Sequence, residues 1–173
     1  SLTRANAAIE SGAFADEVVP VTFKTRKGDV TVDTDEQPGK GRPDKIPQLR
    51  AAFAKDGTIT AATSSSISDG AAAVVLTRES IAAENGQTPV AKIVGMAAHA
   101  REPKDFTVAP VGAIEKVLAN TGWSIDDVDL WEVNEAFACV AMFAMRDIGI
   151  LHEKINVNGG ATALGHPIGA SGT

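Results

Sequence analysis

The sequence predicts an α/β fold built as a layered sandwich of helices and sheets, of which these 173 residues hold only a part. Strand-like and helix-like segments alternate after residue 90, which implies a parallel sheet with right-handed crossovers. The helix predicted at 135–148 is apolar on nearly all sides, so it must be enclosed between two layers. The chain also stops directly after a glycine-rich run of the kind that leads into a helix. We therefore expect it to be a fragment of a longer chain.

The first predicted elements are a hairpin and a loop. Residues 18–24 and 30–32 are rich in β-branched side chains and flank Lys27-Gly28, which predicts a β-hairpin. Residues 33–48 are dense in proline, glycine and charge and should form a surface loop. A short helix is expected at 49–54, stopped by a glycine.

A turn-rich stretch at 64–70 then precedes a continuous apolar segment at 71–76, which we expect to be a strand. A helix should follow at 78–85. Residues 86–89 contain Gly and Pro and are the best candidate for a domain boundary.

The second half is predicted to alternate regularly. The expected order is a strand at 90–97, a helix at 110–120, a strand at 128–133, a helix at 135–148 and a strand at 155–158. The helix at 110–120 has the clearest ends, because Pro110 lies in its first turn and Gly122 follows its last turn.

Composition excludes several classes of partner. A net charge of −6 and a pI near 5.0 argue against a nucleic-acid partner, since phosphate contacts need a basic face. The longest apolar run, 136–145, is too short to span a bilayer, so we expect no membrane partner. No charged-then-apolar leader opens the chain. A single cysteine, Cys139, excludes an internal disulfide, and we expect a cytoplasmic protein.

The glycine-rich run 158–172 is the strongest candidate for a functional loop. It matches neither a Walker loop nor a dinucleotide fingerprint. Its distinctive residue is His166, set between Gly165 and Pro167. The proline keeps His166 out of helical geometry, so a rigid loop would present an imidazole able to donate, accept or pair with a thiolate. The alternative is a glycine-rich turn with a surface histidine.

Asn134 is the second candidate, because it lies where a predicted strand ends and the enclosed helix begins. Ligands of α/β sheets gather at the carboxyl ends of strands. An asparagine at this point can cap the helix, or it can orient a water molecule or a carbonyl oxygen.

Together these stretches resemble the thiolase family. The resemblance is carried by Asn-Glu-Ala-Phe at 134–137, Gly-Gly-Ala at 159–161 and Leu-Gly-His-Pro-Ile-Gly at 164–169. Residues 57–61 and 68–73 also resemble the family's pantetheine-tunnel segment. The resemblance covers essentially the whole chain. It implies an αβαβα sandwich, only partly present here, and an enzyme that makes or breaks the carbon–carbon bond of a 3-ketoacyl-CoA through a cysteine acyl-enzyme.

The resemblance also implies roles for individual residues. His166 would activate the nucleophile and donate to the thioester oxygen, and Asn134 would hold a water molecule that is the second donor. Ser65 would contact the pantetheine, with Ala61 and Ala136 lining its tunnel.

Lys40 and Arg42 lie in the loop that would cover the nucleotide end of CoA, where they could meet a phosphate or stack on adenine. A merely solvated loop is the alternative. The implied division is a loop region over the CoA site at 1–67, the last strand and helix of the N-terminal domain at 68–88, and a truncated C-terminal domain at 89–173.

The family's two catalytic cysteines are expected to lie before Ser1 and after Thr173. Cys139 is interpreted as a core residue of the apolar helix. We therefore expect the fragment itself to be inactive. We expect acyl-CoA and acetyl-CoA as substrates, no tightly bound cofactor, no metal and no potassium requirement, and a dimer or tetramer as the intact protein.

Residues 105–106 and 109–111 look closer to the short-chain members of the family, the acetyl-CoA acetyltransferases of fatty acid metabolism. The alternatives are a longer-chain degradative 3-ketoacyl-CoA thiolase and a non-catalytic acyl-CoA or lipid-binding protein.

Overall fold

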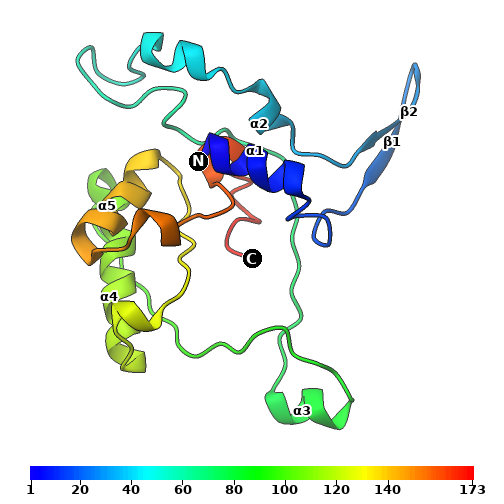
Figure 1. The fold of residues 1–173 in the computed structure, drawn as a ribbon, viewed down its shortest axis with the longest axis vertical. Coiled ribbons are helices and arrows are strands. Elements are labelled where there is room, and N and C mark those ends of the chain that lie inside the picture. The colour runs from blue at the N-terminus through cyan, green and yellow to red at the C-terminus, as the bar shows by residue number, and fades with distance from the viewer.

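The computed structural model describes residues 1–173 and shows an open arrangement of short elements (Figure 1). The molecule exposes 12666 Å² of surface. A compact chain of 17.9 kDa is expected to expose only about 8,000 Å². Because only 18 of the 173 residues are buried, most apolar side chains that could form a core remain uncovered.

A helix that the sequence analysis did not predict begins the chain. Helix α1 spans Leu2–Ser11 and ends at Gly12, whose φ of 74° is the left-handed conformation that glycine adopts without strain. It buries Ala5 and Ala8. Helix α1 packs against the short helices α2, Glu36–Lys40, and α6, Ala161–Leu164 (Figure 1).

The predicted hairpin is confirmed. Strands β1, Val21–Thr25, and β2, Gly28–Val32, pair antiparallel. The register places Val21 opposite Val32 and Phe23 opposite Val30, so the apolar side chains share one face. All residues of both strands are exposed, and the hairpin projects away from the helices (Figure 1).

The loop predicted at 33–48 is partly wrong, because it contains α2 and a 3-10 helix at Pro43–Gln48. The helix predicted at 49–54 is also wrong. Its backbone is extended and bent, and the Ala52 amide donates to the Ile59 carbonyl. A proline just before this segment and a glycine just after it leave too short a run to nucleate a helix in water.

Two predicted strands do not form. Residues 71–76 and 90–97 lack strand pairing and are largely exposed. An apolar segment becomes a strand only where a second segment offers it hydrogen bonds. Within these 173 residues the C-terminal half has one such pairing in its predicted sheet, a parallel bridge between Trp131 and Ile155. The strands predicted at 128–133 and 155–158 are therefore reduced to that single bridge.

The helices predicted at 78–85, 110–120 and 135–148 are confirmed with small shifts. Helix α3 spans Glu79–Glu84. Helix α4, Ala109–Thr121, follows a 3-10 helix at Pro103–Val108 and ends at Gly122, with a φ of 72°. Further 3-10 helices lie at Ile125–Asp127 and His152–Lys154.

Helix α5 spans Ala138–Ile148 and ends at Gly149. It begins later than expected, because Phe137 is still extended, with φ −134° and ψ 152°. Helices α4 and α5 pack side by side (Figure 1). The main core is formed by the buried face of α5 and by residues before and after that helix. It consists of Val133, Val140, Ala141, Ala144, Ile150 and Ile155.

Only one face of α5 is covered in this structure. Val140, Ala141 and Ala144 are buried, whereas Met142 is 60% exposed. The side of the helix that the chain leaves uncovered therefore includes the apolar Met142, together with the charged Arg146 and Asp147. None of the helices combines the length and apolar character that crossing a membrane requires.

Candidate active site

The segment before α5 is held in place by the side chain of Asn156. The backbone N–H of Asn156 donates to the Trp131 carbonyl, and this is the last backbone hydrogen bond of the parallel bridge. The side chain then continues the ladder. Val133 N–H donates to Asn156 Oδ1 at 2.8 Å, and Asn156 Nδ2 donates to the Val133 carbonyl at 2.9 Å. Asn156 is only 3% exposed, so these bonds are shielded from water and fix the backbone next to Asn134.

Glu135 joins this segment to the start of α6. Its carboxylate accepts from Asn156 Nδ2 at 2.9 Å, from Thr162 Oγ1 at 2.5 Å and from the Thr162 amide at 3.3 Å. Burial by itself raises the pKa of the Glu135 carboxyl, but hydrogen bonds from Thr162, Asn156 and Ser1 outweigh it and bring the pKa below its ordinary value. Gly160 lies against this carboxylate, and a Cβ there would clash with it.

His166 is positioned by the preceding Gly165 and by backbone contacts with the segment 64–70. Gly165 has a φ of 93°, and a Cβ at this residue would collide with the Ser68 hydroxyl, so glycine is required. The His166 amide donates to the Ser66 carbonyl at 2.9 Å, and His166 forms a parallel bridge with Ile67. The glycine-rich loop is thereby held against the segment 64–70.

The structure brings Asn134 and His166 together. Asn134 Nδ2 lies 3.2 Å from His166 Nε2. On the other side of the ring, His166 Nδ1 lies 2.7 Å from Ser171 Oγ, which is 3.2 Å from the Pro167 carbonyl oxygen. Both nitrogens of the imidazole therefore have a partner within the chain.

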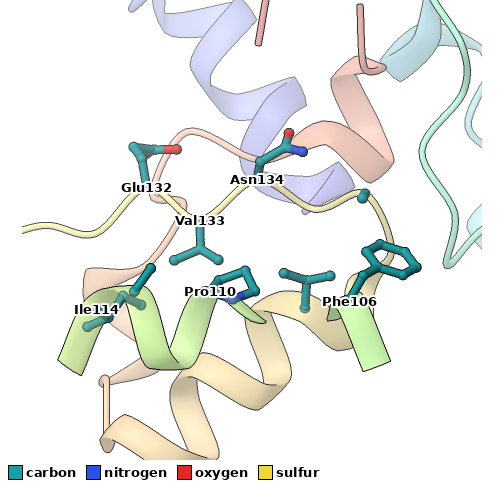
Figure 2. A pocket seen from close by; sticks show the side chains of 9 residues that line it. Phe106, Pro110, Ile114, Glu132, Val133 and Asn134 are labelled. Atoms are coloured by element: carbon teal, nitrogen blue, oxygen red, sulfur yellow. The ribbon is translucent and has the colours of Figure 1, made fainter. Parts of the chain in front are cut away.

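Asn134 lies between two cavities. One, of about 290 Å³, is lined by Glu132, Val133, Asn134, Gly159, Gly160, Ala161, Leu164, Gly165 and Ser171. The other, of about 350 Å³, is mainly apolar and is lined by Phe106, Pro110, Ala113, Ile114, Glu132, Val133, Asn134, Ala136 and Val140. Figure 2 shows Val133 pointing toward α4 and Asn134 pointing to the opposite side. This alternation is that of an extended segment.

Glu132 also borders both cavities. Partial burial, together with repulsion from the Glu135 carboxylate, raises the pKa of Glu132 above its ordinary value. The two acidic side chains beside Asn134 are thus shifted in opposite directions, because only Glu135 has hydrogen-bond donors around its carboxylate.

The segment predicted to contact pantetheine is hydrogen-bonded to the residues at the start of α5. The Ser65 amide and hydroxyl both donate to the Ala136 carbonyl, at 3.1 and 3.0 Å. Ala136 lines the apolar cavity, which places Ser65 beside it. Ala61 is exposed, near Thr63, whose carbonyl accepts from the Ala138 amide.

The two predicted basic contacts lie elsewhere. Lys40 pairs with Glu36 at 2.7 Å, and both side chains are exposed. Arg42 is exposed at the start of the 3-10 helix Pro43–Gln48. Neither side chain forms a hydrogen bond with Asn134 or His166. Their predicted contact with the nucleotide end of CoA stays a prediction.

Sequence reasoning missed the residues that support the site: Glu135, Asn156, Thr162 and Ser171. Three of them lie within the motifs already noted, where each was only one polar residue among several. Their roles depend on contacts between segments far apart in sequence. The only local clue is that Asn156 and Glu135 are polar positions within an otherwise apolar context.

Comparison with known proteins identifies relatives for the whole chain. Residues 1–80 match the family model "Thiolase, N-terminal domain", and residues 87–173 match "Thiolase, C-terminal domain". An acetyl-CoA acetyltransferase of Yarrowia lipolytica is 51% identical over 99% of this chain. The chain spans only 43% of that relative's length.

Solved structures agree. A crystal structure of the Bacillus anthracis acetyl-CoA acetyltransferase matches with a TM-score of 0.93 and 43% identity over 99% of this chain and 44% of that chain. The Acat5 thiolase from Ascaris suum, solved in complex with coenzyme A, matches with a TM-score of 0.91 and 42% identity over the same shares.

Proposed function

This chain belongs to the thiolase family and has part of the thiolase fold, and from this premise we propose that the longer protein containing it is an acetyl-CoA acetyltransferase. The single observation that carries the proposal is the approach of Asn134 Nδ2 to His166 Nε2, at 3.2 Å beside a glycine-lined cavity. Two polar groups that converge on one point can both act on one substrate oxygen.

The proposed reaction is acyl transfer through a cysteine that lies outside these 173 residues. The thiol would give its proton to His166 Nε2 while its sulfur forms a bond to the acyl carbon. The CoA thiolate would leave and take that proton, which completes the acyl-enzyme. The thiolate of the family's second cysteine, also outside these residues, would then take a proton from the α-carbon of acetyl-CoA. The enolate carbon would bond to the acyl carbon as the bond from that carbon to the nucleophilic cysteine breaks, and the proton would pass to the cysteine thiolate that leaves.

The enolate and the tetrahedral intermediates place negative charge on a thioester oxygen. While it carries the thiol's proton, His166 Nε2 would donate to the oxygen of the tetrahedral intermediate, and the Asn134 amide, directly or through a water molecule, would donate to the oxygen in either step. Preorganised donors of this kind contribute roughly 3–4 kcal/mol each to transition-state stabilisation. The buried network of Asn156 and Glu135 supports this role, because it holds the Asn134 backbone rigidly.

CoA thioesters are the proposed substrates. We propose that Ser65, Ala61 and Ala136 contact the pantetheine, and that Lys40 and Arg42 meet the nucleotide end. The relatives' names and the coenzyme A bound to the Ascaris suum thiolase support this substrate class. The closeness of Ser65 to Ala136 beside an apolar cavity supports the pantetheine path.

The test is an assay of the full-length protein. We expect acetoacetyl-CoA formation from acetyl-CoA, and CoA-dependent cleavage of acetoacetyl-CoA faster than that of a long-chain 3-ketoacyl-CoA. A reversed preference would favour a degradative thiolase. Binding of CoA thioesters with no turnover by the pure protein would overturn the catalytic proposal and leave a binding protein.

A further inference from the structure

The two ring nitrogens of His166 have different partners. Asn134 Nδ2 lies 3.2 Å from Nε2, and Ser171 Oγ lies 2.7 Å from Nδ1. A neutral imidazole carries a proton on one nitrogen and a lone pair on the other. The partners therefore decide which nitrogen holds the proton.

The Ser171 hydroxyl favours one of the two tautomers, because it has an acceptor other than the ring within hydrogen-bond distance. Ser171 Oγ lies 3.2 Å from the carbonyl oxygen of Pro167, which can only accept a hydrogen bond. When the hydroxyl donates to Pro167, its oxygen is left to accept from an N–H at His166 Nδ1. This step does not depend on how the Asn134 amide is oriented.

The opposite side of the ring agrees with this assignment. With the proton on Nδ1, His166 Nε2 carries a lone pair, and the Asn134 amide donates to it. With the proton on Nε2, two donors would face each other across 3.2 Å, and the hydroxyl of Ser171 would have to leave Pro167 to satisfy Nδ1. Facing donors cost the free energy of a lost hydrogen bond.

The local fold keeps the hydroxyl beside the ring. The amides of Ala170 and Ser171 both donate to the Pro167 carbonyl, at 2.8 and 3.0 Å. These bonds close a tight turn that starts directly after His166. The distance from the imidazole to Ser171 is therefore set within one short stretch of chain.

We propose that Ser171 is a positioning residue that holds the neutral His166 as its Nδ1–H tautomer, with the Nε2 lone pair on the side of the ring that faces Asn134. The inference rests on the proposed function, in which that lone pair takes the proton of the nucleophilic thiol. The Nδ1 proton stays on the imidazole throughout, hydrogen-bonded to Ser171 Oγ, and the proton gained at Nε2 leaves with the CoA thiolate.

The test uses the full-length protein with ¹⁵N-labelled histidine. Two-bond ¹H–¹⁵N correlation spectra report the tautomer, and the spectrum of a His166→Gln variant assigns the signal. We expect Nδ1–H in the unaltered protein, a shift toward Nε2–H in Ser171→Ala, and Nδ1–H retained in Ser171→Thr. Ser66→Ala is the matched control, because the Ser66 hydroxyl bonds only Ser68 and does not touch the ring.

Kinetics give a second measurement. We expect Ser171→Ala to lower kcat by about 10-fold with KM changed less than about 2-fold, since the residue acts on proton transfer and not on substrate binding. Ser171→Thr should restore most of the lost kcat. An Nε2–H tautomer in the unaltered protein, or a tautomer that Ser171→Ala leaves unchanged, would overturn the inference. If the His166 tautomer changes in Ser171→Ala as expected but the full-length protein has no thiolase activity, the inference is supported and the proposed function is refuted.

Discussion

At the scale of single residues, Glu135 is the clearest example of a side chain that supports the site without facing it. It is 7% exposed and is surrounded by donors from Asn156 and Thr162. Replacing it with Gln would put an amide N–H₂ among those donors. We expect Glu135→Gln to lower the free energy of unfolding of the full-length protein by about 1–3 kcal/mol, measured by urea denaturation.

The matched control is Glu132→Gln. Partial burial and the Glu135 charge raise the pKa of Glu132, so its negative charge is not stabilised by the fold. This variant should leave stability unchanged or slightly increased. Equal losses from both substitutions would contradict the proposed contribution of the Glu135 hydrogen bonds.

The same carboxylate predicts a dependence of stability on pH. The folded protein holds the pKa of Glu135 below its ordinary value of 4.5, and hydrogen bonds are the stabilising cause. A lowered pKa contributes stability that is fully present above pH 4.5 and is lost as the pH falls through the folded-state pKa. Urea titrations of the full-length protein between neutral and acidic pH should show this loss, and Glu135→Gln should lack that part of it.

Activity at the residue scale depends on His166 and Asn134. In the full-length protein we expect His166→Ala to lower kcat by about 10²–10⁴-fold, with little change in CoA binding. Asn134→Ala should cost less, because a water molecule that it positions can find another partner. The two effects should be sub-additive, since both residues serve one oxygen. Near-normal kcat with strongly weakened CoA binding in His166→Ala would show that the loop is a CoA cradle.

These two residues could be predicted from the sequence because their immediate neighbours are distinctive. Pro167 and Gly165 single out His166, and the change from strand-like to helix-like sequence singles out Asn134. Ser171 could not be singled out in this way. Ser171 reaches His166 only because the backbone turns back through hydrogen bonds to the Pro167 carbonyl. No spacing rule for catalytic residues describes this turn.

At the scale of elements, the start of α5 is held by an aromatic cluster. The ring of Phe137 lies 6.3 Å from that of Phe53 and 5.9 Å from that of Phe106, both in tilted or edge-on geometry. These contacts join the loop 49–59 and the 3-10 helix Pro103–Val108 to the residue just before α5. They help to fix where the helix begins, and so where Asn134 lies.

A double-mutant cycle in the full-length protein measures this contribution. We expect Phe137→Leu and Phe106→Leu each to destabilise, with a coupling energy of about 0.5–1.5 kcal/mol. Phe53→Leu combined with Phe106→Leu is the control pair, since only Phe137 is paired with both rings. Additive effects of Phe137→Leu and Phe106→Leu would show that the rings are merely neighbours.

After residue 77 the helices were predicted well, and the strands expected at 71–76 and 90–97 did not form, for a physical reason. The ends of α4 are set by Pro110 and Gly122, which act within one turn of the chain. A strand at 71–76 or 90–97 needs a partner from elsewhere, and these residues contain none. The apolar sequence of both segments remains consistent with strands that pair outside the 173 residues.

At the scale of the whole molecule, the uncovered surface decides how the chain behaves. An exposed area of 12666 Å² is roughly half as much again as a compact chain of this mass has. Val75 and Val90 are almost fully exposed within the two unpaired apolar segments, and Met142 lies on the open face of α5. Large uncovered apolar surfaces of this kind belong to interfaces.

We therefore expect the 173-residue chain, expressed alone, to associate in solution. Sedimentation velocity at increasing concentration should show species heavier than the 17.9 kDa monomer. Because the open face of α5 contributes to that surface, Met142→Glu should reduce association, whereas Lys24→Glu, on the polar face of the hairpin, should not. Supplying the remaining polypeptide of the full-length protein should suppress association further, since it would cover 71–76, 90–97 and α5 together. A clean monomer at high concentration would contradict the layered sandwich, because a helix built to lie between two layers would then be stable with one face in water.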